Sequence, residues 1–166
     1  AVMNNGSIAQ LGTPSDLYEF PASRFVADFI GSVNMFEGKL IDDKPDEAIV
    51  ACPELDPYPV QVPHGVPGKE DSSVWVAIRP EKMNLHKDAD APPTLPECAA
   101  AHNVAKGEIK DISYLGDISI YHVLLANGRL IRISRPNRSR FDQDNFSAGE
   151  KVWVCWGGSS PFVLQP

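Results

Sequence analysis

The sequence predicts a mainly β protein whose strands form a small barrel or sandwich, and three observations favour this fold class. Short apolar runs that alternate with polar residues recur at close spacing through most of the chain. The 15 prolines are spread along the 166 residues and disfavour long helices. Gly, Pro and Asn separate the apolar runs, as turns between short strands require. The apolar fraction of 43% is enough for a packed core.

The first four elements are expected to be two strands and two short helices. Asn5-Gly6 suits a type I′ turn between strands, and a hairpin of this size needs something to pack on. For this reason, and because the chain opens on Ala1, we expect it to begin inside a larger fold. Thr13 is expected to be a helix N-cap, because Pro14 fits the first helical position and Asp16 lies where a capping-box acid would sit. A second helix is expected from Pro21 to a stop at Gly31. Its apolar stripe comprises Phe25, Val26, Phe29 and Ile30.

Residues 34–166 are expected to form one β domain. A domain boundary is therefore expected after residue 33. Strands are expected around residues 33–36, 40–41, 49–50, 60–62, 74–78, 83–85, 104–112, 118–125, 130–133, 152–156 and 162–164. Pro80 is expected to end the strand at 74–78, because proline cannot donate to a ladder. Asn127-Gly128 predicts a second hairpin turn. Segments 87–103 and 134–150 are expected to be loops.

The charge balance excludes some partners. A net charge of −7 argues against nucleic acid or anionic lipid, since binding to phosphates depends on Lys and Arg. One interpretation of the three tryptophans is that they stack on the bases of a nucleic acid; they are Trp75, Trp153 and Trp156. No basic groove accompanies them. Trp153 and Trp156 also point to opposite faces of an ideal strand. We therefore expect these rings to pack in the core.

The cysteines and histidines do not predict a metal site or a disulfide framework. Cys52, Cys98 and Cys155 are far apart and odd in number, which indicates reduced thiols. Cys155 lies between two tryptophans in a strand pattern and suits a small apolar filler. The four histidines share no metal-ligand spacing; they are His64, His86, His102 and His122. His122 alternates with its neighbours in a strand, so a core or rim position is expected.

Two stretches resemble parts of known proteins. Residues 2–31 match a strand, N-x-G, a strand ending Q-x-G-T-P and then L-Y-E-x-P-x-x-x-F-V-A-D-F-I-G. This pattern resembles the stretch that follows the switch histidine in ATP-binding subunits of ABC importers, which implies that residues 1–33 are the end of an ATP-binding domain. Four further islands, in their order and spacing, resemble the TOBE domain, an OB-like β module at the C-terminus of many such subunits. They are residues 34–38, 76–81, 114–123 and 149–152. The spermidine/putrescine branch is the most similar.

The resemblance implies a part without catalytic machinery. In such subunits the phosphate loop, signature motif, magnesium-binding carboxylates and switch histidine lie upstream. Gly68-Lys69 is not a phosphate loop, because Pro63 stands at the first glycine position and Glu70 at the Ser/Thr position. We therefore expect no enzyme activity and no cofactor in this chain, with ATP and magnesium bound by the rest of the parent protein.

Five residues are candidates for an interface or regulatory site. Arg79 and Glu81, at a strand end, either bridge to a partner subunit or ATPase domain, or pair with each other or a nearby carboxylate. Tyr114 and Asp117 flank a bend where Asp117 is expected to bond backbone N–H groups; a ligand contact is the alternative. Arg132 points away from its cluster neighbours, which argues against one anion-binding patch. The cluster comprises Arg129, Arg132, Arg135, Arg138 and Arg140. It is expected to be solvated or to meet an acidic patch of a dimer partner.

The main hypothesis is a regulatory domain that stabilises a homodimer of an ABC importer ATPase for polyamines. The resemblance implies contact with its own ATP-binding domain, membrane permease partners and a cytoplasmic place at the inner face of the membrane. The alternative is a small-ligand sensor that binds the transported solute or an oxyanion. An acidic stretch suits a polyamine, although such stretches are usually only solvated; it comprises Asp42, Asp43, Asp46 and Glu47. Binding of nucleic acid is a third hypothesis that the charge disfavours.

Overall fold

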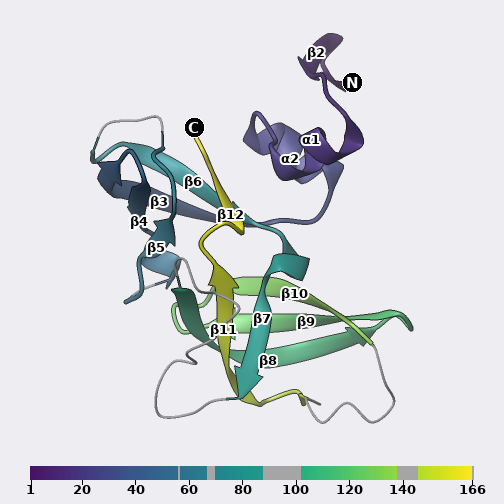
Figure 1. Cartoon of the computed structure of the whole chain (residues 1–166). Helices are drawn as coiled ribbons and strands as arrows, with labels where there is room; N and C mark the ends of the chain where they lie inside the picture. The colour runs from purple at the N-terminus through teal and green to yellow at the C-terminus, as the bar shows by residue number, and fades with distance from the viewer. Residues whose placement is uncertain (56, 67–69, 88–101, 138–145, 166) are drawn as a thin grey trace.

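Two five-stranded antiparallel sheets pack against each other in the computed structural model, which describes residues 1–55, 57–66, 70–87, 102–137 and 146–165 (Figure 1). The first sheet has the order β12-β6-β3-β4-β5, with β3 at Asn34–Lys44, β4 at Glu47–Ala51, β5 at Val60–Val62, β6 at Ser73–Ile78 and β12 at Pro161–Leu164. The second sheet has the order β10-β9-β8-β11-β7, with β7 at Asn84–Lys87, β8 at His102–Tyr114, β9 at Ile118–Leu125, β10 at Leu130–Pro136 and β11 at Lys151–Gly157. This arrangement confirms the mainly β, barrel-like class.

The main core lies between the two sheets. Strands of the first sheet contribute Phe36, Leu40 and Val76, and strands of the second contribute Ile109 and Val154, all fully buried. Each residue alternates with an outward neighbour, which is the period-2 pattern that the sequence displays. One face of each sheet therefore supplies the common core.

The chain crosses between the sheets at two places. A 3₁₀ turn, η2 at Pro80–Lys82, links β6 of the first sheet to β7 of the second, and a turn after β11 leads back to β12. Pro80 ends the β6 ladder, as predicted. A second 3₁₀ turn, η1, lies at Pro53–Leu55. Because η2 is a crossing point, it sits at the common edge of the barrel.

The N-terminal elements are β1 at Val2–Asn4, β2 at Ser7–Gln10, α1 at Pro14–Glu19 and α2 at Arg24–Ile30. Asn5 and Gly6 have φ of 48° and 79°, which confirms a hairpin turn with two positive φ angles. The predicted capping box is also present: the Asp16 amide donates to the Thr13 hydroxyl, and the Thr13 amide donates to the Asp16 carboxylate. Figure 1 shows both helices beside one end of the first sheet.

Helix α2 differs from its prediction in two respects. It begins at Arg24 rather than Pro21, because the Ser23 side chain accepts from the Val26 amide and caps the first turn. The predicted stripe is also split. Val26 and Ile30 pack with Val2 of β1 and Leu17 of α1. By contrast, Phe29 is 65% exposed and stacks on Phe25. The buried arc includes Ala27 instead, which packs on the outer face of the first sheet.

Strand β3 is one long strand where two short strands were expected. Gly38 lies inside it, at a point where a Cβ would come within 2.7 Å of the Cys52 sulfur and of a Val50 methyl. The glycine therefore permits a close approach of strands and does not end one. Strand β10 also extends to Pro136, into a segment predicted to be a loop. Residues 88–101 and 138–145 of the two predicted loops lie outside the described residues.

The tryptophans of β11 pack as expected. Trp156 belongs to the main core, and Trp153 faces the other side of the sheet in a small cluster with Val104, Cys155 and Tyr58. Cys155 is fully buried as a free thiol, as is Cys52. Cys98 lies outside the described residues. Both α-helices are far shorter than the roughly 20 residues that a membrane span requires, and no helix in the described ranges could cross a bilayer.

Candidate functional site

Arg79 lies at the centre of a contact between the helices and the barrel. It follows β6, whose outward residues Trp75 and Ala77 form the face on which α2 packs. The alternation of strand residues places Arg79 on that same outer face. Its side chain is only 1% exposed, so the fold encloses a guanidinium group between α1, α2 and β6.

The guanidinium of Arg79 donates to four backbone carbonyls. Its Nη1 lies 3.0 Å from the Ala27 oxygen, 3.0 Å from the Gly31 oxygen and 3.2 Å from the Ser32 oxygen, and its Nη2 lies 3.1 Å from the Tyr18 oxygen. These carbonyls include the ends of α1 and α2, which carry partial negative charge and have no partner within their helices. One side chain therefore binds carbonyls at the C-termini of both helices.

Aromatic rings cover the same guanidinium. Its carbon atom lies 4.1 Å from the centre of the Tyr18 ring and 5.7 Å from the centre of the Phe162 ring in β12. Rings within about 6 Å attract a cation through their negative faces. The charge of Arg79 is thus compensated by dipoles and rings. Within the described residues no ion pair joins it to Glu81 or to another carboxylate, contrary to the interpretation of Arg79 as part of an ion pair at the rim of the barrel.

The η2 turn makes two further contacts with α1. The Tyr18 hydroxyl donates to Glu81 Oε1, and Lys82 Nζ lies 3.3 Å from Glu19 Oε1. Burial, followed by the hydrogen bond to the Glu81 carboxylate, raises the pKa of Tyr18 to about 12. We name this set of contacts the helix–barrel joint: Arg79, Glu81 and Lys82 on one side, and Tyr18, Glu19 and the C-terminus of α2 on the other.

The other three candidate residues lie in the β8–β9–β10 part of the second sheet. Tyr114 ends β8 and is 73% exposed, and Asp117 is exposed in the turn that follows. Gly116 has φ of 98°, which confirms the predicted tight bend. Asn137, and not the Asp117 side chain, ties this bend: its backbone amide donates to the Asp117 carbonyl, and its side chain donates to the Gly116 carbonyl. Arg132 is exposed in β10.

The structure therefore separates the five candidates into two groups. Arg79 and Glu81 meet in the helix–barrel joint, and Tyr114, Asp117 and Arg132 belong to a different part of the barrel. Residues of the arginine cluster also separate: Arg135 lies over Phe146, whereas Arg129 reaches the Met35 carbonyl in the first sheet. Arg138 and Arg140 lie outside the described residues. The positions of the five candidates do not test their predicted roles at an interface or regulatory site, which stay predictions.

Two asparagines that the sequence did not indicate join the sheets. Asn34 of β3 exchanges two hydrogen bonds with the backbone of Arg132 in β10, at 2.7 and 2.9 Å. Asn103 of β8 does the same with the backbone of Gln61 in β5, at 2.7 and 2.9 Å. Both side chains are buried, and each satisfies one amide and one carbonyl of the opposite sheet. An asparagine beside a strongly apolar run was the only available signal.

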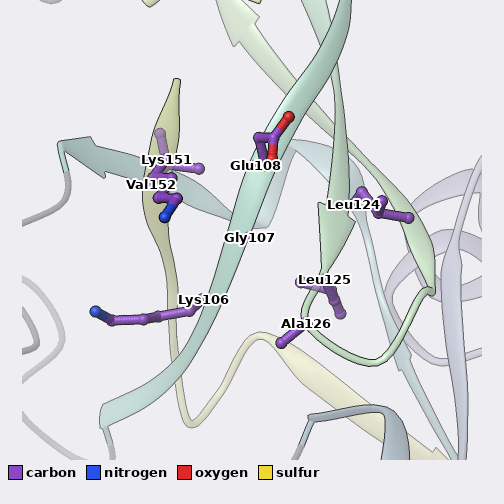
Figure 2. A pocket seen from close by; sticks show the side chains of 8 residues that line it. All are labelled: Lys106, Gly107, Glu108, Leu124, Leu125, Ala126, Lys151 and Val152. Carbon is purple, nitrogen blue, oxygen red and sulfur yellow. The ribbon is translucent and has the colours of Figure 1, made fainter. Parts of the chain in front are cut away.

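A surface hollow of about 370 Å³ lies over the second sheet (Figure 2). Its lining comes from β8, β11 and the end of β9; it comprises Lys106, Gly107, Glu108, Leu124, Leu125, Ala126, Lys151 and Val152. The Glu108 carboxylate lies 2.6 Å from Lys110, and the Lys106 ammonium lies over the Trp153 ring at 4.5 Å. No group of three or more His, Cys, Asp or Glu side chains suited to a metal ion occurs in the described ranges. The expectation of no cofactor stays a prediction.

Comparison with known families identifies the barrel. Residues 76–164, more than half of the chain, match the TOBE domain family. The chain belongs to the TOBE domain family. This TOBE domain is 38% identical, over 99% of its length, to the putrescine transport ATP-binding protein PotG of Escherichia coli (strain K12). It is 37% identical, over 94% of its length, to the spermidine/putrescine import ATP-binding protein PotA of Chromobacterium violaceum. The predicted resemblance to ATP-binding subunits of polyamine importers is thus confirmed.

The matches cover part of each relative. The chain spans 41% of the length of both relatives, or about two fifths. Among solved structures, the TOBE domain is similar to the cytoplasmic molybdate-binding protein ModG, with a TM-score of 0.64 and 12% identity. That match covers 80% of this chain and 96% of the other, and it shows a shared fold alone. TOBE domains are non-catalytic regions of ABC ATPases.

Proposed function

We propose that this TOBE domain is the regulatory and dimer-stabilising part of an ABC importer ATP-binding subunit for polyamines. The names of its relatives support the solute class. The chain itself neither binds nor hydrolyses ATP; ATP and magnesium belong to the ATP-binding domain of the same subunit. That subunit works at the cytoplasmic face of the membrane, against permease subunits.

The observation that carries the proposal is an apolar surface on residues 1–31. Six of the ten large apolar side chains that are exposed in the described residues lie there: Met3, Ile8, Leu11, Phe20, Phe25 and Phe29. Such a concentration of exposed apolar side chains within 31 residues indicates a contact with another protein surface. We assign its covering to the ATP-binding domain of the same subunit.

The helix–barrel joint gives this contact a mechanical role. Because Arg79 binds the ends of both helices, a displacement of residues 1–31 carries the barrel with it. Two barrels that hold each other would keep their ATP-binding domains close together while these open and close. Such tethering raises the effective concentration of one domain near the other.

A chimera tests the proposal. The segment of the Escherichia coli putrescine transport ATP-binding protein that matches this chain is replaced by the chain, in cells that lack the native subunit. Putrescine uptake and ATPase activity of the purified importer should both persist. A matched chimera with Arg79→Met should be produced but should couple ATP hydrolysis to uptake less well. A well-produced chimera that assembles with no permease, or one without uptake, contradicts the proposal.

The ligand-sensing alternative has one specific observation in its favour, the hollow bordered by Lys106 and Lys151. The two ammonium groups outnumber the Glu108 carboxylate in this lining, and Lys110 pairs with that carboxylate, so the hollow favours a small anion over a polyamine, which is itself a cation. Figure 2 shows that the Lys106 amine extends away from Leu125 and Ala126, so only part of the hollow is positively charged. Calorimetry with phosphate, sulfate, spermidine and putrescine at physiological salt tests this function. An absence of heat at millimolar ligand rejects it.

A further inference from the structure

Strands β8, β9 and β10 carry a transverse row of charged and polar side chains on their outer face. In register, Arg132 of β10 lies opposite His122 of β9, and His122 lies opposite Asp111 of β8. The neighbours Ile131 and Val123 are buried in the main core, so the row points away from it. Within the described residues, no ion pair involves Arg132 or Asp111. The row is therefore charged at both ends and unpaired.

Apolar side chains flank this row on the same face. Ile118, Ile120 and Leu124 alternate with the inward residues of β9 and are half-buried. Leu130, opposite Leu124 in register, is 51% exposed. Leu115, at the β8–β9 turn, is 58% exposed. We name this surface the β9 face: the outward residues of β8, β9 and β10 from the β8–β9 turn to Leu130.

We propose that the β9 face binds the same face of a second copy, about a two-fold axis parallel to β9. This inference rests on the proposed dimer and names its surface. An interface of this symmetry must be complementary to itself. The row satisfies that requirement because it is positive at Arg132 and negative at Asp111, with His122 between them.

The charges favour an axis parallel to β9 over an axis that runs across the strands through the row. An axis parallel to β9 exchanges β8 with β10 and places Arg132 opposite Asp111 of the second copy. An axis along the row would place Arg132 opposite Arg132 of the second copy, which is repulsive. With the first axis, Ile120, His122 and Leu124 all lie on the axis and meet their own copies, so the imidazole is flanked by apolar side chains. The charges of Arg132 and Asp111 lie to either side of this centre, and charges at the rim are usual in an interface.

The size of the β9 face predicts a weak dimer. Three strands about 4.8 Å apart, and the eight residues of β9 at about 3.3 Å each, cover an area of roughly 14 Å by 26 Å. This is below the ~800 Å² per partner of a standard interface. The contact is therefore suited to two barrels already brought together by their ATP-binding domains. Its measurement on the 166-residue chain requires high micromolar concentrations.

Charge reversal tests the axis and the face together. Sedimentation equilibrium of the chain should show a reversible dimer that salt weakens. Arg132→Asp and Asp111→Arg should each raise the dissociation constant by about tenfold or more, and the double variant should recover it to within about threefold of the unmodified chain. Lys39→Asp, an exposed lysine in β3 of the first sheet, is the matched control and should leave it unchanged. Circular dichroism verifies that each variant is folded.

The outcomes separate this inference from the proposed function. A dimer that none of the reversals alters overturns the β9 face, and one that the double variant fails to recover overturns the axis. A strict monomer at high micromolar concentration overturns both this inference and the dimer part of the proposed function. Putrescine uptake by the chimera reports separately on the place of the domain in the importer.

Cross-linking gives an independent measurement. Ile120→Cys, in a Cys98→Ser background, places a thiol on the proposed axis, while Cys52 and Cys155 are buried. A short bismaleimide should link two copies through position 120 far more efficiently than through Lys39→Cys. Equal yields at the two positions would reject the face.

Discussion

At the scale of single residues, Arg79 shows how a buried charge becomes a connector. Enclosing a guanidinium is costly unless its donors are satisfied. Here the two terminal nitrogens donate to four carbonyls and two rings cover the group, while the buried Nε has no hydrogen-bond partner among the described residues. The carbonyls in turn would lack a partner without Arg79, because they lie at or beyond helix ends. The two terminal nitrogens of Arg79 and the carbonyls therefore act as hydrogen-bond partners for each other, and neither set is buried without a partner.

Replacement of this residue should be costly. Arg79→Met removes the donors and leaves buried carbonyls unpaired, so we expect the free energy of unfolding to fall by about 3 kcal/mol. Arg24→Met is the control, since Arg24 is exposed and only lies over the Trp75 ring at 4.2 Å; it should cost about 1 kcal/mol or less. Urea denaturation followed by tryptophan fluorescence measures both. Equal losses in the two variants would contradict this account.

Tyr18 predicts a contribution of the joint to alkaline stability. Its pKa is raised to about 12 in the folded chain, above the ordinary value of 10.0, so the folded state holds the phenol proton more tightly. That stabilisation is fully present below pH 10 and is lost as the pH rises toward 12. Ultraviolet titration of tyrosinate should show one group near 12 that disappears in Tyr18→Phe. A group that persists in Tyr18→Phe would assign the shift elsewhere.

At the scale of elements, the length of β3 depends on one glycine. Gly38 allows β4 and the Cys52 segment to approach β3, because a Cβ there would lie 2.9 Å from the Ala51 carbonyl oxygen and 2.7 Å from two side-chain atoms. The backbone oxygen cannot move without disturbing the ladder between β3 and β4. The glycine thus permits the close approach of β3 to the end of β4.

Gly38→Ala should accordingly destabilise the chain by about 2 kcal/mol through overpacking. Gly157→Ala is the matched control, since its Cβ would meet only the Ser160 hydroxyl, at 3.7 Å, an ordinary contact. Thermal unfolding should separate the two variants by several degrees. A Gly38→Ala protein as stable as the Gly157→Ala protein would show that the strands can move apart at little cost.

Local patterns predicted most elements, and long-range contacts account for the differences. The apolar runs in β6, β9 and β11, the Thr13 capping box and the Asn5-Gly6 turn each depend on neighbours within a few residues, so the sequence indicates them. The continuity of β3 through Gly38 was not predicted, because the atoms that require a glycine there belong to Val50, Ala51 and Cys52, which lie in and just after β4.

The candidate site shows the same division. Arg79 was singled out, but its acceptors are carbonyls of residues 18–32, which no side-chain pattern marks. The apolar stripe of α2 is split because the helix contacts both the first sheet and the β1 and α1 residues. The bend after β8 is held by Asn137, which follows β10, and not by the Asp117 side chain as predicted. Contacts of this kind require the fold before they can be identified.

At the scale of the whole molecule, the chain is two sheets and a helical segment held by a few polar side chains. Asn34 and Asn103 each join one sheet to the backbone of the other, and the joint fixes the helices to the place where the chain crosses between sheets. Apolar burial supplies most of the attraction between these parts. The hydrogen bonds fix their relative positions.

Removal of the helical segment tests this organisation. Residues 34–166 alone should be less stable than the whole chain by about 3 kcal/mol or more, because the outer face of the first sheet is uncovered and Arg79 loses its acceptors. In that fragment Arg79→Met should cost less than about 1 kcal/mol, since the guanidinium is then solvated. The difference between the two costs measures the coupling. Equal costs in fragment and whole chain would show that Arg79 acts within the barrel alone.

The joint also constrains the order in which a newly made chain can mature. Its parts are encoded far apart: Tyr18 and Ala27 near one end, Arg79 in the middle, and Phe162 in the strand that completes the first sheet. A ribosome produces the helical segment first, yet the ring that covers Arg79 follows only after nearly all of the barrel has been translated. Until then the Arg79 guanidinium lacks one of the two rings that cover it, and the first sheet lacks its edge strand. Chaperones that bind nascent chains should therefore contact the incomplete barrel and leave only once β12 is in place.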